Sequence, residues 1–199
     1  MDVHVIGIEQ ARPFILKKHY AKRMPNVMFS FGGYIGTDLV GIVTYGMPPS
    51  PSLCKGVCGD EHKGKVIELN RLVVDRGSAS ELIGKSLKQL PTPKIVVSYA
   101  DTGMGHVGYV YQATNWLYTG FTKERTDMLS ESGHSRHNLG DRNLRQVRTS
   151  KHRYVYFLGN HKQKKEFIRS LNYKPRKYPK GDTEKYEVSA RFPTQMLLV

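Results

Sequence analysis

The sequence lacks an apolar run long enough to cross a membrane, and its N-terminus has no signal-peptide pattern. Cysteine is scarce: Cys54 and Cys58 are separated by three residues, and only His62 lies nearby as a further zinc ligand. A structural zinc site needs four ligands, so two free thiols in a reducing cytoplasm are the favoured interpretation. No internal repeat is visible. These absences predict a soluble, cytoplasmic protein with neither a disulfide scaffold nor a membrane partner.

Positive charge, by contrast, is abundant and unevenly distributed. The 199 residues carry 31 Lys and Arg against 17 Asp and Glu, a net charge of +14. Residues 1–120 hold 13 basic and 9 acidic side chains, whereas residues 121–199 hold 18 and 8. A basic region with interleaved aromatic residues favours a polyanionic partner, most simply nucleic acid, over a basic face that only aids solubility. We therefore expect one domain, 1–199, whose basic C-terminal region, about 122–199, contributes to DNA binding.

Runs of apolar residues predict an alternation of strands and helices. Strands are expected at 1–8, 28–35, 39–45, 66–74, 94–100 and 152–158, with an edge strand at 186–191. Helices are expected at 10–19, 78–90, 108–116 and 162–171. The Pro- and Gly-rich segment 46–65 is predicted to be a long loop that lies across the ligand-binding cleft expected in such a sheet. Segment 122–151 is predicted to be polar and irregular. The order indicates an α/β (α+β) fold, with a mixed, mostly antiparallel sheet and helices on both faces.

Chemistry-bearing residues concentrate after the expected strand at 94–100. The segment from Ser98 to Gly120 places Asp101, His106 and four tyrosines where a strand ends and a helix begins. Ligands bind at such carboxyl ends in open α/β sheets. Asp101 is a candidate general base, with a helix N-cap as the alternative. Tyr111 and Tyr99 are candidate proton donors.

The order of elements resembles the GNAT acyltransferase fold. In that fold, acetyl-CoA lies along an open strand edge and its pyrophosphate binds at the start of the next helix. The resemblance implies contacts along strand 69–74 and loop 75–80, although Val74 stands where the fold usually has Gln or Arg. Ser78 as an ordinary N-cap, with Glu81 completing a capping box, is the alternative. The implied cofactor-binding residues are Leu72, Val73, Val74, Arg76, Gly77, Ser78, Ser80 and Ser86.

Several short segments, taken in order, carry a closer resemblance. They are 18–20 (KHY), 68–74 (ELNRLVV), 80–86 (SELIGKS), 98–101 (SYAD), 105–108 (GHVG), 111–116 (YQATNW) and 151–155 (KHRYV). Together they resemble the Mom family of phage DNA-modification proteins, GNAT relatives that modify adenine in double-stranded DNA. The resemblance covers roughly residues 15–125 and the strand at 151–155.

The resemblance to the Mom family implies an enzyme, a transferase that uses acetyl-CoA. It would modify the N6 amine of adenine, leave a methylcarbamoyl or acetamido-type adduct, and protect phage DNA from restriction in the host cytoplasm. The resemblance also implies an iron ion, Fe²⁺, with His19, Tyr20 and Asp101 as its ligands, and an active-site role for Tyr111. A GNAT enzyme acting on a protein or small-molecule amine, and a non-catalytic DNA-binding protein, are the alternatives. The oligomeric state stays open, with a homodimer as one option.

An exocyclic adenine amine is a poor nucleophile, so the site must orient it, take a proton from it and stabilise an oxyanion. The candidate catalytic residues are Asp101, Tyr111, His19, Tyr20 and Tyr99. His19 as a helix C-terminal histidine is the alternative for that residue. A base inside a duplex must be flipped out, which requires a grip on the backbone. The candidate phosphate contacts are Lys18, Lys22, Arg23, Arg136, Arg142, Arg145, Arg148, Lys151 and Arg153.

Overall fold

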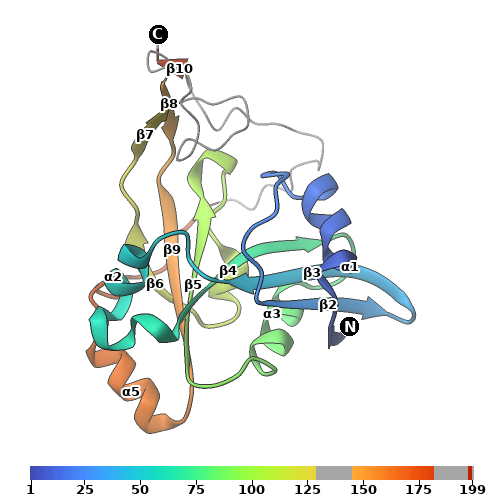
Figure 1. Cartoon of the computed structure of the whole chain (residues 1–199), viewed down its shortest axis with the longest axis horizontal. Coiled ribbons are helices and arrows are strands. Elements are labelled where there is room, and N and C mark those ends of the chain that lie inside the picture. Colours follow the sequence, from blue (N-terminus) through green and yellow to red (C-terminus); the bar gives the residue numbers. More distant parts are fainter. Residues whose placement is uncertain (129–144, 182–196, 199) are drawn as a thin grey trace.

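The structure is a computed structural model that describes residues 1–128, 145–181 and 197–198 (Figure 1). Its centre is a seven-stranded sheet with the strand order β1-β2-β3-β4-β5-β9-β6. The strands are β1 (Asp2–Val5), β2 (Phe29–Ile35), β3 (Asp38–Gly46), β4 (Val66–Val74), β5 (Lys94–Asp101), β9 (Lys151–Leu158) and β6 (Leu117–Phe121). Only β4 and β5 pair in parallel. The predicted mixed, mostly antiparallel sheet is therefore confirmed.

Helices cover both faces of this sheet. Val43 of β3 packs with Leu82 of α3 (Ala79–Leu87), whereas its neighbour Ile42 packs with Ile15 on the opposite face. Side chains alternate along a strand, so consecutive residues report the two faces. The face of α3 also carries α4 (Tyr109–Gln112). The other face carries α1 (Ile8–Pro13), which continues as a π turn η1 (Phe14–Lys18), with α2 (Pro51–His62) and α5 (His161–Arg169).

The strands β4 and β5 diverge after three paired residues. Their parallel pairing ends at Glu68 opposite Val97, yet β4 continues to Val74 and β5 to Asp101. Among the strands that the structure describes, β4 beyond that point pairs only with β3, and β5 only with β9. The register between β3 and β4 also shifts, leaving Asn70 as a bulge between the pairs made by its neighbours. A bulge bends a strand and re-aims the side chains that follow.

Segment 46–65, predicted to be a loop, is instead mostly helical. α2 begins after Ser50, whose side chain accepts a hydrogen bond from Leu53 N at 3.3 Å, with Pro51 at the first helical position. Cys54 and Val57 are buried against the sheet. The helix kinks at Cys58 and Gly59, and η2 (Lys63–Lys65) leads into β4. The Pro and Gly content that suggested a loop therefore starts this helix and kinks it.

The helix predicted at 108–116 was too long. α4 ends at Gln112, Asn115 adopts a left-handed φ of 59°, and β6 begins at Leu117, where no strand was expected. The region predicted to be irregular contains β7 (Arg125–Met128) and β8 (Arg145–Arg148), which form a small sheet with β10 (Leu197–Leu198). The edge strand predicted at 186–191 lies outside the described residues. No helix in the described ranges is long and apolar enough to span a membrane.

Candidate active site

A group of ionisable and polar side chains collects where β4 and β5 diverge, on the sheet face that carries α1 and α2. Glu68 of β4 lies opposite Val97, and Tyr99 and Asp101 follow Val97 at the alternate positions that share its face. Lys151 of β9 pairs directly with Asp101. The turn after η1 brings His19 and Tyr20 to the same place. We call this set the strand-end cluster; its members are His19, Tyr20, Glu68, Arg71, Tyr99, Asp101, His106 and Lys151.

Asp101 is buried, and its carboxylate is fully engaged inside the protein. It forms an ion pair with the Lys151 ammonium and accepts hydrogen bonds from Thr149 Oγ1 at 2.5 Å and from Gly103 N at 3.0 Å. The last of these caps the 3-10 turn η3 (Thr102–Met104). The capping role considered for Asp101 is thus observed, but on η3 rather than on a helix from residue 105. All of these contacts come from groups within the protein.

His19 is buried and uncharged. Its Nδ1 accepts a hydrogen bond from Ala21 N at 3.0 Å, and its ring stacks on Tyr20 with centroids 4.4 Å apart. Burial, with the positive charges of Arg71 and Lys151 and the neighbouring His106, lowers the pKa of His19 to about 3. The neutral ring therefore carries its proton on Nε2.

This lowered pKa makes the stability of the protein depend on pH. Below pH 6.5 the unfolded chain binds a proton at His19, whereas the folded chain does not bind it until the pH is near 3. The free energy of unfolding therefore falls as pH drops from 6.5 toward about 3. The loss approaches roughly 1.4 kcal/mol for each pKa unit. We expect His19→Asn, which keeps an acceptor for Ala21 N, to flatten this dependence in urea titrations at several pH values. His4→Asn, at an exposed site, is the matched control; equal slopes for both variants would contradict the prediction.

The residues implied as iron ligands do not fit an iron ion. The only lone pair on the His19 ring already accepts a backbone N–H, and Asp101 is neutralised by Lys151. The surrounding charges of Arg71 and Lys151 disfavour a further cation. Within the described ranges, the close set of His, Cys, Asp and Glu side chains is Glu61, His62 and Glu166, which lies elsewhere, on α2 and α5.

Tyr111 approaches the divergence from the other face, through Ser98 of β5. The Ser98 hydroxyl donates to the Leu69 carbonyl at 2.9 Å and lies 2.8 Å from the Tyr111 hydroxyl. Because Ser98 has one proton, Tyr111 supplies the proton between the two hydroxyls. Burial raises the pKa of Tyr111 to about 12 and also raises the pKa of Tyr99. Both phenols therefore stay protonated at neutral pH.

Side chains at the bulge in β4 form hydrogen bonds to the loop that carries His19 and Tyr20. Arg71 donates from Nε and Nη2 to the Arg23 carbonyl at 3.3 and 3.1 Å. Asn70 Nδ2 donates to the Asn26 carbonyl at 2.7 Å. The side chain of Asn26 in turn accepts from Met47 N at 3.3 Å. We call residues 19–28 the strap. Its position depends on backbone carbonyls that sequence patterns do not reveal.

The predicted cofactor-binding residues fall into two groups. Leu72, Val73 and Val74 lie on the part of β4 that has left β5, and are partly exposed. Ser78 caps α3 by accepting from Glu81 N at 3.2 Å; no capping box forms, because the Glu81 carboxylate binds the Met1 amine and Lys85. The rest of the loop consists of Arg76, paired with Asp38 at 2.8 Å, Gly77, with φ 93°, and Ser80, bonded to Ser78 at 3.0 Å.

Ser86 lies apart from these residues. It is fully buried and its hydroxyl lies 2.7 Å from the Tyr45 hydroxyl. Its own proton goes to the Ile83 carbonyl at 3.0 Å. The side chain of Ser86 therefore packs inside the core, and its contact with a cofactor stays a prediction.

Several predicted phosphate contacts have partners within the protein. Lys18 pairs with Asp75, Lys151 pairs with Asp101, and Arg153 donates to Thr119 Oγ1 at 2.9 Å. The Arg153 guanidinium also stacks 3.3 Å from the centroid of the Tyr173 ring. Lys22 and Arg23 are exposed on the strap, and Arg148 is half-buried at the end of β8. Arg145 lies in β8, and Arg136 and Arg142 lie outside the described residues. These phosphate contacts remain predictions.

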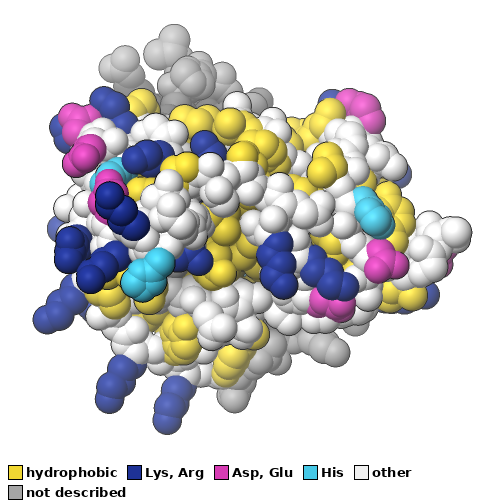
Figure 2. Space-filling model, turned by 90° about the horizontal axis from the view of Figure 1, so that it is seen from below, with side chains coloured by type: hydrophobic (Ala, Val, Ile, Leu, Met, Phe, Trp, Pro, Cys, Tyr) yellow, Lys and Arg dark blue, Asp and Glu magenta, His cyan; other side chains and the backbone are white. Residues whose placement is uncertain are grey.

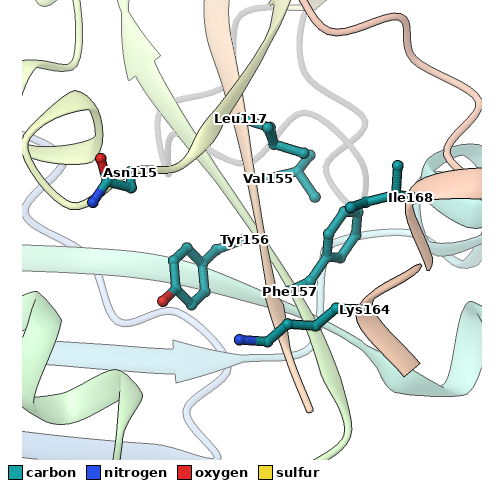
Figure 3. A pocket seen from close by; sticks show the side chains of 7 residues that line it. All are labelled: Asn115, Leu117, Val155, Tyr156, Phe157, Lys164 and Ile168. Carbon is teal, nitrogen blue, oxygen red and sulfur yellow. The ribbon is translucent and has the colours of Figure 1, made fainter. Parts of the chain in front are cut away.

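Positive charge also gathers away from the strand-end cluster. Figure 2 shows Lys and Arg side chains on the side of the molecule where α2 and α5 lie. The exposed basic residues of α5 are Lys162, Lys164, Lys165 and Arg169. A hollow of about 250 Å³ borders this helix, with Lys164 and Ile168 facing Asn115 and Leu117 across it (Figure 3). Its remaining lining comes from Val155, Tyr156 and Phe157. It shares no residue with the strand-end cluster.

Glu68, Arg71 and Thr149 were given no role by sequence reasoning. The available signal was local: Glu68 and Arg71 interrupt an otherwise apolar strand, 66–74. Charged residues are seldom buried without a partner or a task. Thr149 left no signal, because its contact with Asp101 joins positions 48 residues apart.

Two sequence comparisons with known proteins point to the same family. The Mom protein family matches residues 1–139. The methylcarbamoylase mom of Escherichia phage Mu is 33% identical over 129 residues, which cover 60% of this chain and 54% of that protein. The match thus spans about half of its length. Similar solved structures include a GNAT-family acetyltransferase from Bacillus cereus (12% identity, TM-score 0.44, 80% and 98% of the chains) and Arabidopsis thaliana NAA60 in complex with acetyl-CoA (15%, 0.47, 80% and 99%).

Proposed function

Since this chain belongs to the Mom protein family, we propose that it uses acetyl-CoA to modify the N6 amine of adenine in double-stranded DNA. The adduct is of methylcarbamoyl or acetamido type and hides phage DNA from host restriction enzymes. The name of the phage Mu relative, a methylcarbamoylase, supports this assignment. The observation that carries it is the divergence of β4 and β5, which places an unpaired strand edge beside the strand-end cluster.

The β4 side of the divergence suits the donor. The unpaired edge at Leu72–Val74 offers backbone groups for the pantetheine arm, and the N-terminus of α3 with Arg76 offers a place for the pyrophosphate. Acetyl-CoA would supply an activated carbonyl carbon at this point. The nearby backbone would then donate hydrogen bonds on one side, where the Tyr111 phenol holds Ser98 in place, while the strand-end cluster receives the amine on the other.

The strap side suits the DNA. A flipped adenine entering beside His19 and Tyr20 would meet an aromatic pair for stacking. Lys22 and Arg23, exposed on the same strap, would contact the backbone of the displaced nucleotide. Neutral His19 adds no charge that would repel the adenine amine as it becomes positive during bond formation.

Mass spectrometry of nucleosides from DNA co-expressed with the protein tests this proposal. We expect modified adenine, and the mass of the adduct identifies it, because a methylcarbamoyl group contains a nitrogen that an acetyl group lacks. Unmodified adenine in the presence of folded protein and acetyl-CoA would refute the proposal. DNA affinity should also fall steeply with salt concentration, whereas an amine substrate on a protein or small molecule would leave it flat.

A non-catalytic DNA-binding protein is the second candidate, favoured by one observation. Asp101, the acid implied for the active site, is held entirely by internal partners. If the chain only binds DNA, Asp101→Ala and Tyr111→Phe should leave its biological effect intact wherever DNA binding is intact. Loss of modification with retained DNA binding in Tyr111→Phe would exclude this candidate.

A further inference from the structure

Glu68 lies at the point where β4 and β5 separate. It is the last residue of β4 paired with β5 in parallel, opposite Val97, and on its other side it pairs with Gly46 of β3. The neighbouring Ile67 and Leu69 pack into the core on the α3 face. Alternation therefore directs the Glu68 side chain to the opposite face, the one on which the strand-end cluster lies.

The Glu68 carboxylate is available, in contrast to that of Asp101. Among the described residues it has neither a hydrogen bond nor an ion pair. The one enclosed polar side-chain atom that lacks a partner there is Trp116 Nε1. The Glu68 oxygens are consequently not fully enclosed by the described residues.

The surroundings of Glu68 bring the pKa of its carboxyl group close to neutral pH. Burial raises the pKa of Glu68 to about 7, and the charges of Arg71 and Lys151 limit this rise. The groups that interact with it come from five elements: Arg71 of β4, Tyr99 of β5, Lys151 of β9, Tyr111 of α4 and Cys54 of α2. The tyrosines stay protonated, since burial raises the pKa of both. Glu68 is thus the group in this set that exchanges a proton at physiological pH.

We propose that Glu68, rather than Asp101, is the general base that takes the proton from the attacking amine. This inference rests on the proposed function. For the acetamido-type adduct, with acetyl-CoA as donor, the N6 lone pair forms a bond to the thioester carbonyl carbon, and the carbon–sulfur bond breaks with its electron pair on sulfur. One N6 proton passes to the Glu68 carboxylate. The thiolate takes a proton from solvent, and the Glu68 carboxylic acid later returns its proton to solvent.

Asp101 then has a positioning role. Its ion pair fixes Lys151, and Lys151 with Arg71 keeps enough positive charge beside Glu68 for part of it to be ionised at neutral pH. A base whose pKa lies near the working pH balances the fraction ionised against proton affinity. The two carboxylates differ in role because they differ in surroundings. Asp101 is paired with Lys151 and accepts two hydrogen bonds, whereas Glu68 is half-buried and has no such partner among the described residues.

The test compares wild type with Glu68→Gln and Glu68→Asp in purified form, with adduct formation measured on both sides of pH 7. We expect the wild-type rate to rise with pH through a limb near 7. Glu68→Gln should lower the rate by about 10²- to 10⁴-fold and abolish the limb, and Glu68→Asp should recover part of it. Affinities for DNA and for acetyl-CoA should not change, because the amide keeps the size of the side chain.

The outcomes separate the two proposals. Wild type that forms no adduct refutes the proposed function. Wild type that forms adduct, with Glu68→Gln matching it in rate and pH profile, refutes only the role of Glu68. Should the variants fold poorly, a carboxyl ¹³C NMR titration of wild type replaces them. A midpoint for Glu68 near 7 is expected, and one near the ordinary value of about 4.3 overturns the inference.

Discussion

Asp101→Asn is expected to lower the free energy of unfolding by about 3 kcal/mol. The amide keeps an acceptor for Thr149 and Gly103 but leaves the Lys151 ammonium without its carboxylate. Removing one partner of a buried ion pair typically costs about 3–5 kcal/mol. The lower end applies because Lys151 keeps 33% of its side chain in solvent. Urea unfolding at pH 7 measures the change.

Two further variants interpret that measurement. Asp101→Asn combined with Lys151→Met removes the uncompensated charge, so we expect it to regain much of the lost stability. Asp38→Asn breaks the exposed pair with Arg76, in which both side chains are more than 60% exposed, and should cost less than about 1 kcal/mol. Equal costs for Asp101→Asn and Asp38→Asn would show that burial adds nothing to the Asp101 pair.

Most of the sheet could be predicted from sequence because most of its strands are marked by short apolar runs. Runs such as 66–74 and 94–100 are apolar and bounded by turns, and the structure places β4 and β5 there. α2 was missed because its Pro and Gly residues suggest a loop, whereas Pro51 occupies a helix start and Gly59 a kink. Local composition therefore distinguishes a strand from its flanking turns, but it does not distinguish a kinked helix such as α2 from a loop.

The candidate site was predicted in part for the same reason. Asp101 and Tyr111 fall within one short segment, and the structure places both at the end of β5 or just beyond it. What changes the role of Asp101 is Lys151, which lies 50 residues later and meets it only through the pairing of β5 with β9. The sequence does not single out Glu68, because its surroundings depend on where β4 and β5 part. Sequence patterns indicate candidate residues, while their protonation depends on long-range pairing.

The site also divides its hydrogen-bonding groups between the two sheet faces. On the α3 face, Tyr111 reaches the divergence through Ser98 as a donor. On the opposite face, Glu68 and Asp101 are acceptors, one open and one occupied. The strap covers this second face and is attached by backbone carbonyls to Asn70 and Arg71. Activity should therefore be sensitive to the strap even where no reacting group is altered.

Gly46→Ala is expected to displace the strap. A Cβ at this position would lie 1.9 Å from the Asn26 carbonyl oxygen and 2.8 Å from its carbon, and backbone atoms cannot swing aside as a side chain can. The strap must move, with His19 and Tyr20 on it. Such overpacking costs about 1–3 kcal/mol of stability. Because a displacement of about 1 Å can slow a positioned reaction about 10²-fold, adduct formation should fall by that order.

Hydrogen exchange and adduct formation, measured on the same samples, test this variant. Amides of residues 19–28 should lose protection in Gly46→Ala, while those of β5 and β9 keep theirs. Gly84→Ala is the matched control: no atom lies within 4 Å of its added Cβ, and in a helix the change stabilises by up to about 1 kcal/mol. It should leave exchange and activity of the strap unchanged. A Gly46→Ala protein with wild-type protection and activity would show that the strap tolerates the added methyl group, and that its close approach to β3 does not position His19.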